Sequence, residues 1–172
     1  QKTRELLARQ DIDTRVRTTM LVEYVHGLWS DKDPIVLVYL TPPYYPHVHV
    51  SGESEKERLL LRAVEEAVNS TRTDYKVSYK KFFPYISDLS YGAAPQDPEI
   101  IRALKRNTPG FGAFYDLPLK EMQALNLPVV NIGPFGKDAH KFTERIEKNY
   151  TFQVAPELVH KTVLNLLREE KA

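Results

Sequence analysis

One stretch of the sequence carries residue types that could bind a metal ion, a histidine and a glutamate behind a glycine-containing turn. His140 follows the apolar segment 127–132 and the turn of Gly133 and Gly136, and Glu144 comes four residues later. Such a turn after an apolar strand places the next side chains at the rim of a sheet, where α/β folds bind ligands. Neutral imidazole binds zinc well, and a carboxylate one helical turn later would lie beside it. An ordinary surface helix start explains the same residues, so both interpretations stand.

Ser87 and Asp88 form a second candidate site. They follow the alternating segment 75–83, and polar groups at the carboxyl end of a strand lie where open sheets bind ligands. The pair could therefore contact a substrate or orient a metal ligand. A Ser or Asx turn that caps the next segment explains the pair equally well.

Two weaker patterns lie between residues 41 and 49. His47 and His49 have the i, i+2 spacing that puts both rings on one face of an extended chain, where they could form a metal pair, although solvated loop histidines are the simpler interpretation. The Tyr and Pro cluster 41–46 could line a substrate pocket with rigid rings or serve only for packing.

Composition excludes several classes of protein. The chain has 172 residues, of which 42% are hydrophobic, so it is long enough for a core. Lys and Arg number 24 against 23 Asp and Glu, and a net charge of +1 offers no broad field for nucleic acid or an anionic membrane. The longest apolar run, 35–40, is far shorter than the ~20 residues that cross a bilayer. With no cysteine, any metal must use His, Asp or Glu, which suits a cytoplasmic setting.

Helical and strand patterns alternate along the chain. Asp13 is a candidate N-cap, and Ser54 with Glu57 forms a capping box. We predict one domain over 1–172, with a helical lead-in over 1–30 and an α/β portion over 31–172. Its fold class is α/β, a mostly parallel sheet with helices on both faces. The expected helices are 4–9, 13–29, 54–69, 98–106, 119–125 and a terminal one from 156, and the expected strands are 35–40, 75–83 and 127–132.

Several segments carry a resemblance to a known family. The stretches FPYISDLSYGA and LNLPVVNIGPFGKDAHKFTERI, with the terminal amphipathic helix, resemble the C-terminal part of the zinc amidohydrolases that include aminoacylases, acetylornithine deacetylase and succinyl-diaminopimelate desuccinylase. More closely, VYLTPPYYPHV, KKFFPYISDLSY and GKDAHKFTERIEKNYTF resemble the bacterial arginine utilisation proteins of this family. The resemblance covers most of 33–170. It departs from the common pattern at 83–85, where many relatives have glycines.

The resemblance implies roles for individual residues. His140 matches the last metal ligand of the family, which completes one zinc of a pair, and Glu144 matches the carboxylate that follows it. Ser87 and Asp88 match a polar pair near the site. The other ligands and the catalytic glutamate of such enzymes would lie before Gln1, so we expect the chain to begin within a longer polypeptide and to hold no catalytic residue of its own.

These implications define the expected function. We expect the C-terminal portion of the catalytic domain of a metal-dependent amide hydrolase or deacylase, in which a zinc-activated water attacks an amide carbonyl. The substrates would be N-acylated amino acids or small peptides, and the resemblance implies a setting in arginine catabolism. The partner would be the remainder of the same polypeptide. The fragment alone should be inactive. The alternative is a non-catalytic α/β binding or scaffold module, in which His140 and the Ser87–Asp88 pair merely cap loops.

Overall fold

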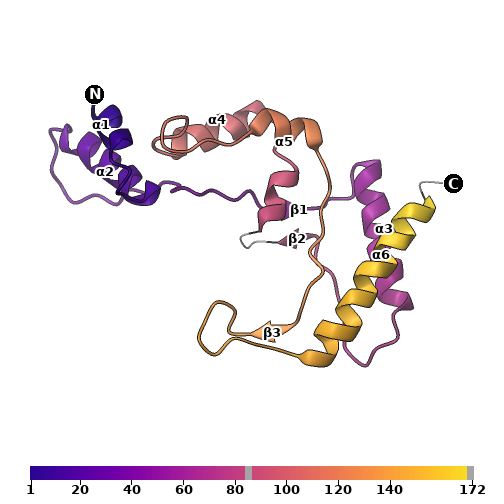
Figure 1. Ribbon diagram of the computed structural model, residues 1–172. Helices are drawn as coiled ribbons and strands as arrows, with labels where there is room; N and C mark the ends of the chain where they lie inside the picture. Colours follow the sequence, from indigo (N-terminus) through magenta and orange to yellow (C-terminus); the bar gives the residue numbers. More distant parts are fainter. Residues whose placement is uncertain (84–86, 170–172) are drawn as a thin grey trace. The chain divides into compact units, whose positions relative to one another are not determined.

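The computed structural model describes residues 1–83 and 87–169 and divides into two compact units. The first unit comprises 1–46 and 93–126, and the second comprises 47–92 and 127–172 (Figure 1). Helices and short strands are both present, which confirms an α/β composition. None of the described helices combines the length and the apolar character needed to span a membrane.

The first unit is helical, and its helices begin where local signals predict them. The side chain of Asp13 accepts a hydrogen bond from the backbone N–H of Arg15 at 2.8 Å and so caps the second helix. Pro98 occupies the first turn of another helix, where its missing N–H does no harm. The helices of this unit are α1 (Lys2–Ala8), α2 (Thr14–Gly27), α4 (Pro98–Asn107) and α5 (Leu119–Leu125).

Backbone contacts hold the proline-rich segment 41–46 in the first unit. The Tyr115 hydroxyl donates to the carbonyl of Tyr44 at 2.9 Å and accepts from the Tyr44 N–H at 3.2 Å. Pro42 and Pro46 are buried. The cluster that sequence reasoning offered as a pocket lining therefore has a packing role at these positions. Leu6, Thr18, Thr108, Leu117 and Met122 are also buried in this unit.

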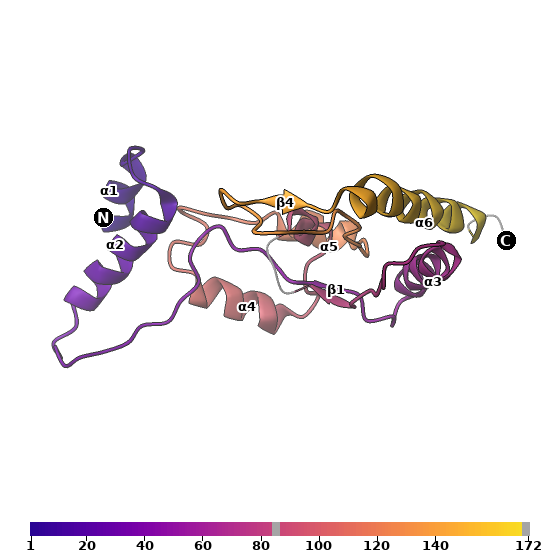
Figure 2. The same ribbon diagram turned by 90° about the horizontal axis from the view of Figure 1, so that it is seen from below.

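The second unit is built on two long helices that lie side by side, α3 (Glu55–Ser70) and α6 (Ala155–Glu169) (Figures 1 and 2). The predicted capping box opens α3, since the Ser54 hydroxyl accepts from the Glu57 N–H at 3.2 Å and the Glu57 carboxylate accepts from the Ser54 N–H at 3.0 Å. A π-helical turn over 150–154 leads into α6, so helical structure begins earlier than expected.

The strands of the second unit form two small antiparallel ladders. Strand β1 (Val48–His49) pairs with β2 (Phe82–Phe83), and β3 (Gly136–Lys137) pairs with β4 (Arg145–Ile146). The mostly parallel sheet predicted from the sequence is not formed by the residues that the structure describes. The expected strands 35–40 and 127–132 are extended but belong to neither ladder. A parallel strand needs a neighbour that lies far away in sequence, so an apolar run alone does not guarantee a ladder.

Candidate functional site

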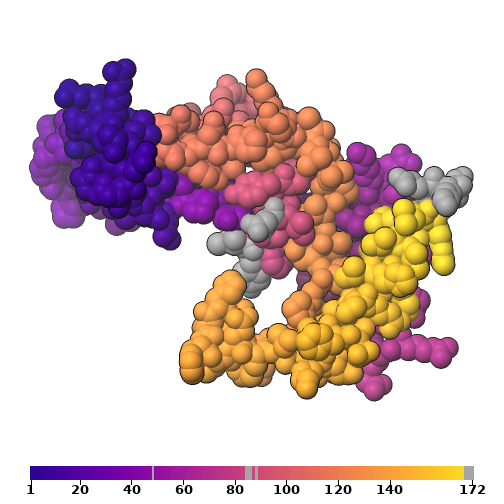
Figure 3. Space-filling model, viewed as in Figure 1, coloured from indigo at the N-terminus to yellow at the C-terminus, as the bar shows by residue number. Residues whose placement is uncertain are grey.

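His140 lies in the loop that joins β3 to β4. The helical turn expected between His140 and Glu144 is not formed, because 138–144 forms turns between the two strands of a hairpin. His140 has a φ of 63° and Asp138 a φ of 57°, in the left-handed region that Asp and His adopt more readily than most residues. The hairpin stands out from the surface of its unit (Figure 3, orange), and the imidazole-bearing residue is exposed.

Glu144 lies beside His140, although a turn and not a helix brings them together. The backbone N–H of His140 donates to Oε2 of Glu144 at 3.2 Å. The loop also contains two backbone bonds, from Lys141 N–H to the Asp138 carbonyl at 2.9 Å and from Glu144 N–H to the Lys141 carbonyl at 3.0 Å. Glu144 therefore shapes the backbone that carries the imidazole.

Contacts that sequence reasoning missed brace the same loop. Asp138 pairs with the guanidinium of Arg145 and accepts from the Thr143 hydroxyl at 3.0 Å. Gly136 is required for close approach of the two strands, since a Cβ there would overlap the carbonyl oxygen of Arg145. An Asp before a tight turn is a sequence signal that could have indicated this loop.

Ser87 caps a turn and contacts the end of the apolar segment 127–132. Its hydroxyl accepts from the Leu89 N–H at 3.3 Å and lies 3.4 Å from Oδ1 of Asn131. The backbone of Asp88 begins a 3-10 turn, and its side chain lies outside the described part of the structure. Asn131 was missed, although a polar residue near the carboxyl end of a predicted strand is the signal that selected Ser87. In the described part of the chain, no hydrogen bond or ion pair joins Ser87 to His140 or Glu144.

The described residues do not by themselves fit a zinc site. Zinc requires three or four protein ligands in catalytic and structural centres. Nowhere in 1–83 or 87–169 do three His, Asp or Glu side chains come close enough together to hold a metal ion. His140 can supply one ligand, and the rest would have to come from elsewhere.

His47, which immediately precedes β1, and His49 within it lie on the same side of the chain, as their spacing predicts. Their ring centroids are 6.4 Å apart, and both rings lie near Phe82 of the paired strand, at 5.4 and 6.3 Å. The two imidazoles and the phenyl ring make an exposed aromatic cluster. The described residues add no third metal ligand to it.

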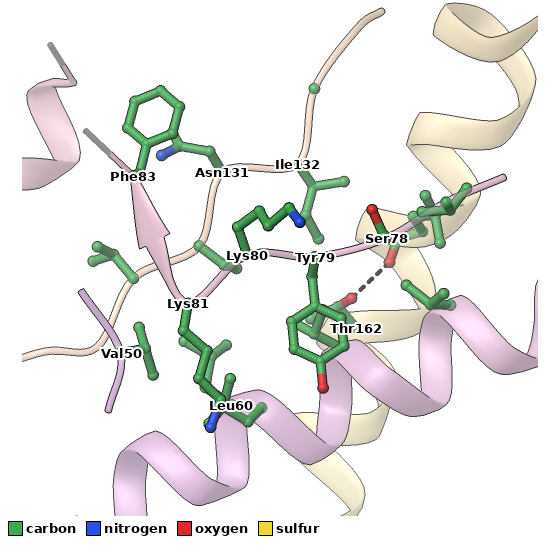
Figure 4. A pocket seen from close by; sticks show the side chains of 18 of the residues that line it. Val50, Leu60, Ser78, Tyr79, Lys80, Lys81, Phe83, Asn131, Ile132 and Thr162 are labelled. Carbon is green, nitrogen blue, oxygen red and sulfur yellow. Dashed lines mark hydrogen bonds between the residues drawn. The ribbon is translucent and has the colours of Figure 1, made fainter. Parts of the chain in front are cut away.

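A cavity of about 450 Å³ lies in the second unit, between α3, α6 and the extended segments 77–83 and 129–134 (Figure 4). Tyr79 and Lys81 point toward the helices, whereas Lys80 points the other way, toward Ile132. This alternation is the side-chain pattern of a β-strand, so the strand pattern read from 75–83 is present even where no ladder forms.

The chain is similar over nearly its whole length to part of a longer bacterial protein. That relative is Protein RocB of Bacillus subtilis strain 168, which is 35% identical over 163 residues, 94% of this chain and 29% of RocB. This match confirms the resemblance drawn from the separated segments. A second protein of the same strain, the uncharacterized protein YqjN, is 31% identical over 166 residues, 95% of this chain and 29% of YqjN.

The chain thus spans less than a third of the length of these curated relatives. No family model matches it. No solved structure matches it either.

Proposed function

We propose that the chain is the C-terminal portion of the catalytic domain of a RocB-type metal-dependent amide hydrolase or deacylase. Its substrates are N-acylated amino acids or small peptides, and its setting is arginine catabolism in the cytoplasm. The observation that carries this proposal is the presentation of His140, exposed on a braced hairpin loop, within a sequence that is similar to RocB over 94% of its length.

In this proposal His140 is one ligand of a two-zinc centre. The remaining ligands and the catalytic base belong to the part of the polypeptide that corresponds to the other 71% of the relatives, since the aligned region is 29% of each. Ser87 and Asp88 lie near the substrate in the assembled enzyme. The 172 residues alone are then inactive, because one imidazole does not make a zinc site.

We propose that the remainder of the polypeptide also completes the fold of this chain. We propose that 127–132 joins a mostly parallel sheet with helices on both faces, whose other strands lie outside these residues. The open cavity beside 129–134 supports this, because its mainly apolar lining leaves room for further apolar side chains to pack.

The test is a hydrolysis assay on the intact polypeptide with a panel of N-acylated amino acids, with and without a metal chelator. We expect activity that chelation abolishes. The variant His140→Asn should lose at least about 100-fold in rate, because it removes the imidazole yet accepts the left-handed backbone. His160→Asn, the same change at an exposed position on α6, is the matched control and should retain activity. If the intact protein binds no metal, and if His140→Asn leaves its hydrolysis rate unchanged, the non-catalytic module is favoured instead.

A further inference from the structure

The most apolar segment of the first unit is also among its most exposed. In the run 35–38, Val36 and Val38 are 88% and 90% exposed, and Ile35 and Leu37 on the opposite side are also exposed. Alternation puts these two pairs on opposite faces of an extended chain. A strand that is apolar on both faces is the pattern of a strand buried inside a sheet.

The backbone of this segment is as open as its side chains. Within the described residues, no backbone hydrogen bond reaches 35–39, and pairing begins only at Leu40, whose N–H donates to the Asn107 carbonyl at 2.8 Å. Buried backbone groups need partners, so whatever covers these side chains must also supply hydrogen bonds to both edges of the segment. A β-strand does both, whereas the face of a helix supplies no backbone partners.

An apolar groove of about 560 Å³ lies beside the run, between α2 and residues 34–37. Its walls come from Leu21, Val22 and Val25 of α2, and it includes Trp29, which is 68% exposed. Apolar grooves of this kind on a folded protein mark interaction sites. The groove and the run form one continuous surface of the first unit, since Ile35 and Leu37 belong to the run and also line the groove.

We propose that 35–39 is an internal docking strand, paired on its edges with apolar β-strands from the part of the polypeptide outside these 172 residues. The inference rests on the proposed function, which places the chain within a longer protein. Two observations identify the partner as strands of the same polypeptide. The backbone groups of 35–39 that are unpaired within the described residues require a β-strand beside them. In addition, the aligned region covers 29% of each relative, so 71% of its length lies outside. The groove beside Trp29 takes apolar side chains that accompany those strands.

Hydrogen exchange of the intact polypeptide, followed by mass spectrometry of peptides that span 35–39, tests this. We expect the amides of this run to exchange at least about 100-fold more slowly than in an unstructured peptide, as in a core strand. Val38→Asp should remove that protection, whereas Ala113→Asp, the same charge in an exposed loop of the first unit, should leave it unchanged. Val38→Thr keeps the shape and the strand preference but buries a hydroxyl, so it should reduce the protection partially, and it serves if the Asp variant fails to fold.

Fast exchange over 35–39 in the intact protein would overturn the inference. Protection that disappears on dilution would also overturn it, because the partner would then be a second copy. The metal assay on His140 reports separately on the proposed function. If that assay succeeds and the run remains unprotected, the docking strand alone is rejected.

Discussion

The carboxylate of Glu144 accepts a hydrogen bond from the backbone N–H of His140, with 3.2 Å between the nitrogen and Oε2. This contact closes a loop in which His140 has left-handed backbone geometry. If His140 binds metal as proposed, this carboxylate acts on the position of the ring through the backbone and without touching the ring. In a metal centre, such orienting contacts are nearly as important as the ligands themselves.

Replacing Glu144 tests this orienting role. In the intact polypeptide, Glu144→Ala should weaken metal binding by about tenfold, because the loop loses the acceptor that closes it. Glu144→Gln keeps a side-chain oxygen for the His140 N–H and should remain close to the parent. Metal titration gives both affinities. If Gln were as damaging as Ala, the negative charge and not the loop contact would be what matters, and Glu144 would act directly on the metal or substrate.

Gly136 provides a test of the hairpin with a built-in control. Gly136→Ala should disrupt β3–β4 pairing, because its Cβ would meet the backbone of Arg145, and we expect a loss of about 1–3 kcal/mol locally. Metal affinity of the intact protein should fall with it. Gly133→Ala lies three residues earlier, where a Cβ has open space, and should leave both quantities unchanged. Equal effects of the two changes would show that the hairpin does not position His140.

Glu57 makes the stability of α3 depend on pH. Burial raises the pKa of its carboxyl, but hydrogen bonds from the N–H and hydroxyl groups of Ser54 and Ser51 outweigh this and lower the pKa from 4.5 to about 2. A folded pKa below the unfolded one stabilises the folded state above pH 4.5, and that stability is lost as the pH falls toward 2. We expect about 1–2 kcal/mol, the usual contribution of a capping group, after allowing for solvent screening.

Urea unfolding at several pH values between about 2 and 4.5 checks this pH dependence. The parent should lose its advantage over Glu57→Gln as the carboxylate is protonated, so the difference in free energy of unfolding should shrink toward acid pH. Glu55→Gln removes one charge from the same first turn and is the control. A difference that stayed constant with pH would mean that the capping box does not hold an ionised carboxylate.

Two neighbouring residues on α6 should differ sharply in their contribution to stability. Leu158 is only 3% exposed, whereas Val159 is 42% exposed. Leu158→Ala should lower the free energy of unfolding by about 2–4 kcal/mol through the cavity it leaves, and Val159→Ala by less than about 1 kcal/mol. Urea denaturation of both variants gives the comparison. A larger loss for Val159 would mean that the other side of α6 carries the packing.

Local signals made the helices predictable. Asp13, Pro98 and the Ser54–Glu57 box each act within one turn of the chain, so the sequence alone places the starts of α2, α4 and α3. The sequence predicted the terminal helix but did not specify its buried face. Leu158 and Thr162 are buried, whereas Val159 and Val163 are exposed, because an amphipathic pattern does not specify which of two adjacent apolar faces finds a neighbour.

The strands depended on partners that the sequence did not reveal. The run 35–40 has the composition of a buried strand, yet within the described residues it belongs to no ladder. The β3–β4 hairpin was missed because its strands are only two residues long, below the length at which alternation is visible. His140 and Glu144 were paired correctly but through the wrong local structure, since i, i+4 proximity arises in turns as well as in helices.

The most direct test of the central claim is a crystal structure of the intact polypeptide, with anomalous diffraction measured on both sides of the zinc absorption edge. We expect a zinc signal about 2.0–2.1 Å from a ring nitrogen of His140, with the other ligands contributed by residues outside this chain. A His140 ring directed away from every anomalous peak, or a protein with no such peak, would contradict it.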